Sequence, residues 1–155
     1  MKPGRHAFTL VEMLLVIVLM GILLALVAPR ITTESVKLSV RSSAQKAGAL
    51  LSQARASAMQ NGRRTAVVRV NNGLRLLIDN GTATPTLLGW QDLGLEEHVT
   101  LASSPSDTIM FDPRGLAVLR GTAVQEIIVT RDTYADTACV IGLGRIATSG
   151  CSALP

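Results

Sequence analysis

The stretch Phe8–Pro29, FTLVEMLLVIVLMGILLALVAP, decides the fold of this chain of 155 residues. Its first 21 residues, Phe8 to Ala28, contain only two polar side chains, those of Thr9 and Glu12. As a helix this run measures about 32 Å, enough to cross a hydrocarbon core of roughly 30 Å. A segment that spans lipid has to be helical, because lipid cannot satisfy exposed backbone groups. The sequence therefore predicts a membrane-spanning helix that carries one unexplained carboxylate, Glu12.

Three other interpretations of the apolar run stay open. A buried core helix is one, although the run is longer than is usual in a soluble protein. A cleavable secretory signal is the second, with Lys2 and Arg5 as its basic region and a cut after Ala28. Leu26 is large for that cleavage site, and Pro29 would follow the cut. A plain membrane anchor is the third, and it gives Glu12 no role.

A second helical pattern follows Pro29, which would kink the helix or mark its exit from the membrane. Apolar residues recur there at steps of three and four, and Asn61-Gly62 ends the pattern. We therefore expect one long helix, about Phe8 to Gln60, whose second half is amphipathic. Its predicted buried stripe consists of Val36, Val40, Ala44, Ala47, Leu51, Ala54 and Ala58.

The rest of the chain is predicted to be β-structure. Thr65–Val70 and Leu74–Ile78 flank Asn71-Asn72-Gly73 and form a hairpin. Asp112-Pro113-Arg114-Gly115 is a turn, and Pro85 and Ser103–Ser106 are predicted loops. Short strands are expected at His98–Leu101, Ile109–Phe111, Ala117–Leu119, Glu126–Thr130 and Cys139–Gly142. The predicted fold is α+β, with the amphipathic half of the helix packed on a small antiparallel sheet.

Charge is distributed unevenly along the chain. Residues 30–75 hold nine Lys or Arg and one acid, whereas residues 76–155 hold four Arg and nine acids. Such asymmetry suggests a basic face for phosphate, lipid headgroups or an acidic neighbour, and an ordinary solvated surface is the alternative.

The two cysteines, Cys139 and Cys151, are predicted to form a disulfide. A domain exported behind a membrane helix meets an oxidising compartment, where such a pair usually bridges. Two cysteines with only His6 and His98 elsewhere do not make a zinc ligand set, so no metal and no cofactor are expected.

The N-terminus resembles that of type IV pilins and pseudopilins. The shared features are a short basic leader, a small residue before Phe8, Thr9-Leu10, Glu12 as the fifth residue after the leader, and Pro29 after the apolar block. The resemblance implies that a prepilin peptidase cuts between Ala7 and Phe8 and methylates the new amine of Phe8. Most family members have Gly before the cut, whereas this chain has Ala7.

The resemblance also offers a role for Glu12. In the family the matching Glu pairs with an N-terminal ammonium in the growing filament. Opposite charges attract strongly in a medium of low dielectric constant, so Glu12 would direct assembly. A Glu at the membrane interface without a partner is the alternative.

The rest of the chain resembles the GspH/FimT branch of the family, in the segment Arg41–Arg64, in FDPRGLA (Phe111–Ala117) and in Gly144-Arg145. Members are scarce subunits of type II secretion pseudopili or type IV pili, near the filament tip. FimT proteins of naturally transformable bacteria bind DNA through a late Gly-Arg-x-Arg motif, and here Ala147 replaces the second Arg. DNA binding is therefore an alternative function. Its contacts would be Arg145, with Arg63, Arg64, Arg69 and Arg75 on phosphates.

The expected protein is a structural subunit and not an enzyme. Gly142–Ala147 mimics a dinucleotide fingerprint, but it lacks the helix, second strand and acid that such a site needs. The predicted organisation is a leader (1–7), a membrane and assembly helix (8–29), its amphipathic continuation (30–62) and a periplasmic β-rich domain (63–155). Other major and minor pilins, the prepilin peptidase and an inner-membrane assembly platform are the expected partners.

Overall fold

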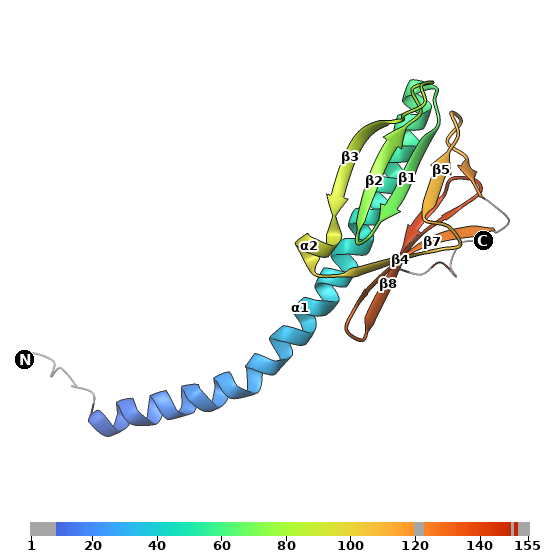
Figure 1. The fold of residues 1–155 in the computed structure, drawn as a ribbon. Helices are drawn as coiled ribbons and strands as arrows, with labels where there is room; N and C mark the ends of the chain where they lie inside the picture. Colours follow the sequence, from blue (N-terminus) through green and yellow to red (C-terminus); the bar gives the residue numbers. More distant parts are fainter. Residues whose placement is uncertain (1–8, 120–122, 150, 152–155) are drawn as a thin grey trace, which may run out of the picture. The chain divides into compact units, whose positions relative to one another are not determined.

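Figure 1 shows a computed structural model of the chain, which describes residues 9–119, 123–149 and 151. The side chains of residues 26–32 lie outside this description. The chain divides between Ser35 and Val36 into two compact units. Helix α1 (Leu10–Asn61) supplies the described structure of the first unit and also enters the second.

The first unit exposes its apolar side chains on every side of α1. Leu10, Ile17 and Leu24 are 80%, 66% and 68% exposed, and the residues between them are exposed as well. Within the described residues, no helix contains an apolar stretch long enough to span a membrane.

In the second unit α1 is amphipathic, as predicted. Of the expected stripe, Val36 is half-buried, and the other six residues are at most 2% exposed. Leu50 and the hydroxyl-bearing Ser43 are buried beside them. Figure 1 shows this part of α1 alongside β1 and β2.

Two antiparallel sheets form the β-structure of this unit. The order of the five-stranded sheet is β3-β2-β1-β5-β6, and that of the four-stranded sheet is β4-β7-β8-β9. A short helix, α2 (Leu93–Glu97), joins β3 to β4. The strands are β1 (Thr65–Val70), β2 (Gly73–Ile78), β3 (Thr86–Asp92), β4 (Thr100–Ser104), β5 (Thr108–Phe111), β6 (Ala117–Val118), β7 (Val124–Arg131), β8 (Tyr134–Ile141) and β9 (Ile146–Thr148).

One core lies between α1 and the inner faces of both sheets. Its largest fully buried side chains include Phe111, Leu51, Leu74 and Ile127. The Thr65 hydroxyl donates to the carbonyl of Ala54 at 2.8 Å, which fixes the start of β1 on the helix. The core therefore holds both sheets in place around the helix.

The predicted β-structure is right in type and incomplete in detail. The hairpin and the turn at residues 112–115 are confirmed. The strand expected at His98–Leu101 is wrong at its start, because His98 caps α2 in a left-handed conformation with φ 54°. The loop predicted at Ser103–Ser106 is wrong at Ser103 and Ser104, which belong to β4. The strand expected at Cys139–Gly142 ends at Ile141 and begins earlier, at Tyr134. Strands β3 and β9 and helix α2 were not predicted.

Candidate functional site

Glu12 lies in the first turn of α1, where Thr9 caps the helix. The Thr9 carbonyl accepts the first helical hydrogen bond from Met13 N–H at 3.2 Å, and its hydroxyl accepts one from Glu12 N–H at 3.2 Å. Thr-x-x-Glu is the pattern of a capping box, and a carboxylate near a helix N-terminus is favoured by the helix dipole. This local role of Glu12 was missed in the sequence, although the spacing Thr9–Glu12 signals it.

The structure covers only part of the predicted processing residues, Ala7 and Phe8, and of the predicted kink at Pro29. Ala7 and Phe8 lie outside the described residues, so their roles remain predictions. The backbone of α1 continues through Pro29 without a break in the helix, and the Pro29 side chain is not described. Helix α1 therefore does not end at Pro29.

The predicted disulfide is present. Cys139 on β8 is bonded to Cys151, with their Cα atoms 5.8 Å apart. Cys139 is fully buried, and Cys151 lies beside Thr137, also on β8, with 3.3 Å between Sγ and Oγ1. The bridge therefore fastens the chain beyond β9 to the four-stranded sheet.

Two of the arginines proposed as DNA contacts are engaged within the domain. The Arg69 guanidinium lies 2.7 Å from Asp107 Oδ1 and donates to Ser103 Oγ at 3.0 Å. The pKa of Asp107 is lowered, first by the hydrogen bond from Ser103 and then by that from Arg69. Arg75 stacks on the Trp90 ring, 4.9 Å from its centre. The charge of Arg69 in particular is already paired with that of Asp107.

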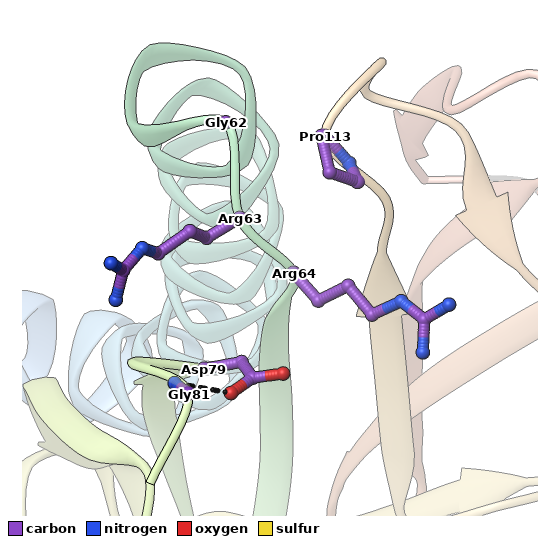
Figure 2. Close-up of a pocket in the computed structure, with 6 residues that line it drawn as sticks. All are labelled: Gly62, Arg63, Arg64, Asp79, Gly81 and Pro113. Carbon is purple, nitrogen blue, oxygen red and sulfur yellow. Dashed lines mark hydrogen bonds between the residues drawn. The ribbon is translucent and has the colours of Figure 1, made fainter.

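Arg63 and Arg64 line a shallow depression of about 420 Å³ beyond the end of α1. Figure 2 shows their side chains extending in opposite directions from adjacent positions. Asp79 and Pro113 complete the lining with two glycines. Neither arginine has an ion pair among the residues that the structure describes.

The turn Asp112–Gly115 connects this depression to the predicted contact Arg145. Gly144 has φ +74°, and a Cβ built on it would lie 2.1 Å from the carbonyl oxygen of Gly115. Only glycine therefore allows the loop after β8 to approach the turn so closely. Arg145 follows directly and is exposed.

Arg55 on α1 fills the space that the two glycines leave. Its Nε would be 3.2 Å from a Cβ on Gly115 and 3.1 Å from one on Gly144. That Nε is buried and has no hydrogen-bond partner among the described residues. A buried donor of this kind is costly unless a partner satisfies it.

Five arginines belong to the segments that meet at or line this turn, and we refer to them as the basic cluster: Arg55, Arg63, Arg64, Arg114 and Arg145. Asp112 offsets part of this charge through Arg114, with 3.3 Å between Nε and Oδ2. The pKa of Asp112 is lowered, mainly by the hydrogen bond from Leu116 N–H and further by that from Arg114 N–H. Asp112 therefore stays ionised and holds the turn. Arg55 and Arg114 were missed in the sequence because nothing local places them beside Arg145.

The remaining candidate motifs do not form sites. Gly142-Leu143 form a tight turn, Ile146 and Ala147 already belong to β9, and no α-helix follows in the described residues, so the dinucleotide interpretation stays rejected. In the part of the chain that the structure covers, no group of three or more His, Cys, Asp or Glu could hold a metal ion.

Comparison with known proteins shows that this chain is similar to pilin-like structural subunits. A family model for the prokaryotic N-terminal methylation motif matches residues 2–28. The model of type II transport protein GspH matches residues 43–144, and the chain belongs to that family. None of the curated proteins compared with the chain matches it.

Solved structures support the fold. The chain is similar to the type IV minor pilin FimU of Pseudomonas aeruginosa strain PAO1 in two crystal forms. The first match has a TM-score of 0.58 at 19% identity and covers 75% of this chain and 92% of FimU. The second has a TM-score of 0.55 at 19% identity and covers 74% and 95%. Both share the helix packed on antiparallel sheets.

Proposed function

We propose that this GspH-family chain is a minor subunit of a type II secretion pseudopilus or a type IV pilus, near the filament tip. The observation that carries the proposal is the order of two family matches, a methylation motif at residues 2–28 followed by a GspH domain at residues 43–144. The apolar part of α1 would anchor the subunit in the inner membrane, with the β-structure in the periplasm. The same helix would then enter the filament. Other pilins, the prepilin peptidase and the assembly platform are its proposed partners.

Processing of the precursor is the first test of this proposal. Co-expression with a prepilin peptidase should remove residues 1–7 by a cut between Ala7 and Phe8 and add one methyl group to Phe8. The intact mass of the product measures both changes at once. A product that has lost residues 1–28 would instead mean that this segment is a cleaved secretory signal, and it would contradict the filament proposal.

Glu12 is the proposed assembly residue. Its carboxylate lies at the start of a helix whose described neighbours up to Ala25 are exposed and mostly apolar. The Glu12→Ala variant should still insert into the membrane but fail to enter sheared filaments, because the charge that pairs with an N-terminal ammonium is gone. Glu34→Ala removes an acid from the same helix beyond the apolar run and serves as the control. Normal incorporation of the Glu12 variant would refute the docking role.

DNA binding is a second candidate, favoured by the basic cluster. Arg63, Arg64 and Arg145 remain exposed, and none of the three has an ion pair among the described residues. Guanidinium groups form charge-assisted hydrogen bonds with phosphates, which gives this surface the right chemistry for a nucleic-acid backbone.

The test of this candidate is the affinity of residues 30–155 for duplex DNA across a salt titration. Affinity should fall steeply with salt, and Arg145→Ala should reduce the slope by about one. Arg41→Ala is the matched control, because it removes one exposed positive charge that is not among the proposed contacts. Absence of binding near physiological salt would contradict DNA binding and leave the structural role as the one proposed function.

A further inference from the structure

The strand β3 forms an unusual edge of the five-stranded sheet. It has seven residues and pairs only with β2 among the described strands. Within the strand, Leu87, Leu88 and Trp90 are 53%, 44% and 44% exposed. A long apolar edge of this kind presents unpaired backbone groups that attract another strand.

The other sheet edges lack these features. Strands β6 and β9 have only two and three residues. Strand β4 has five residues, of sequence TLASS, and Leu101, its one large apolar side chain, is buried. Short edges are a common means of preventing edge pairing. By contrast, residues 86–91 of β3, which follow Pro85, contain no charged residue and no proline and expose three large apolar side chains.

A register shift divides β3 and defines the part that can pair. Leu76 is opposite Gly89 and Leu77 is opposite Leu87, so Leu88 is the extra residue of a bulge. Beyond the bulge, Gly89 to Asp92 keep a regular register with β2. Asp92 then caps α2 by accepting a hydrogen bond from Leu95 N–H at 3.1 Å. The run from Gly89 to Asp92 therefore stays in regular register with β2, and Leu87 and Leu88 precede it at the bulge.

Arg75 adds a charge to this surface. It is exposed on β2 directly opposite Trp90 and stacks on the indole ring, with no carboxylate partner among the described residues. The Trp90 ring also lies over Gly73, where a Cβ would come within 2.3 Å of it. The ring and the guanidinium are thus held in position before any partner arrives. A complementary segment would place an acid beside Arg75.

A second copy of this chain does not offer that acid. In an antiparallel pairing of β3 with its own copy, Asp92 would be the one carboxylate of the strand, and it already accepts the hydrogen bond from Leu95 N–H that caps α2. The surface therefore favours a different partner over self-pairing.

We propose that β3 is a docking edge for an extended segment of another filament subunit, one with alternating apolar residues and an Asp or Glu that reaches Arg75. The added strand would satisfy the free backbone groups of β3, and its apolar side chains would cover Leu87, Leu88 and Trp90. This inference rests on the proposed function, since it names the surface by which the subunit meets its neighbour.

Site-specific photo-crosslinking of the full chain in the cells that produce it tests the proposal. A benzophenone amino acid is placed at Leu87, and separately at Leu143, which is 68% exposed on the loop after β8 and serves as the control. Sheared filaments are then collected, and cross-linked peptides are identified by mass spectrometry. We expect Leu87, and not Leu143, to cross-link to an acid-containing peptide of another filament subunit. We also expect Arg75→Glu to lower that yield to about a tenth, because like charges would then meet.

The outcomes separate the two proposals. If the chain is in the filaments but Leu87 cross-links no more than Leu143, the docking edge is wrong and the filament function stands. A cross-link from Leu87 to a second copy of the chain, or to a protein outside the filament, also overturns the docking edge. Absence of the chain from the filaments overturns both proposals.

Discussion

At the scale of single residues, Gly144 shows how one position joins distant parts of the domain. Its left-handed backbone and lack of a side chain let the loop after β8 touch the carbonyl of Gly115 in the turn at residues 112–115. Arg55 packs against both glycines from α1. Helix, turn and loop therefore meet at a point where no Cβ fits.

Replacement of Gly144 should destabilise the domain. In Gly144→Ala the new Cβ would lie 2.1 Å from a backbone oxygen and φ would be +74°, so we expect a loss of about 2–4 kcal/mol in the free energy of unfolding. Urea unfolding of residues 36–155 measures it. Gly142→Ala is the control, because its Cβ would meet only the Leu119 side chain at an ordinary 3.7 Å. Equal losses in both variants would contradict the role of Gly144.

At the scale of elements, α1 is stabilised by its buried stripe. Leu51 is fully buried at its centre, whereas Leu38 on the same helix is 69% exposed. Leu51→Ala should cost about 2–5 kcal/mol of stability, because a buried leucine leaves a cavity. Leu38→Ala should change stability by no more than about 0.5 kcal/mol. Denaturant midpoints of the two variants check this, and a similar cost for both would show that the stripe is not the packing face.

The attachment of α2 to α1 depends on charge. Lys46 Nζ lies 2.6 Å from Glu97 Oε1 and 3.1 Å from Glu96 Oε2. The hydrogen bond from Lys46 is the main cause that lowers the pKa of Glu97, and a further hydrogen bond from Ser42 adds to it. The hydrogen bonds that Lys46 donates to Glu97 and then to Glu96 raise the pKa of Lys46. The pair is therefore fully charged between acidic and strongly alkaline pH.

The pH dependence of stability follows from these directions. A lowered folded pKa means that Glu97 stabilises the domain above its ordinary value of 4.5, and that this contribution is lost as pH falls through the folded pKa. Near pH 7, Glu97→Gln should cost about 0.5–1 kcal/mol, and the difference from the wild type should shrink below about pH 4. Urea titrations at a series of pH values measure it. Asp132→Asn alters a carboxylate with no ion pair among the described residues and should show no such trend.

The helices and strands differ in the strength of their local sequence signals. The β1–β2 hairpin was predicted because its alternation and its Asn-Asn-Gly turn are local signals. Strand β3 was missed because Leu87 and Leu88 are adjacent at a bulge and break the alternation. Strand β9 and helix α2 have three and five residues, too few to show any period.

At the scale of the whole molecule, the disulfide joins two cysteines that are 12 positions apart near the end of the chain. Cys139→Ala combined with Cys151→Ala should lower the free energy of unfolding by about 3 kcal/mol, because the unfolded chain regains the freedom that the bridge removes. Urea unfolding with and without reductant measures this. Reductant should destabilise the wild type toward the double variant and leave the variant unchanged. A wild type insensitive to reductant would contradict the contribution of the bridge.

The long helix, its buried stripe, the antiparallel β-structure, the disulfide and the resemblance to pilins could all be predicted from the sequence. Periodicity, turn chemistry and cysteine pairing are local or compositional signals, so they can be recognised without coordinates. The tertiary structure alone decided that there are two sheets, that β3 is an exposed edge and that Arg69 is held by Asp107. It also decided that Arg55 and Arg114 join Arg145 at one turn. Such groupings depend on contacts between residues far apart in the chain, which no local pattern encodes.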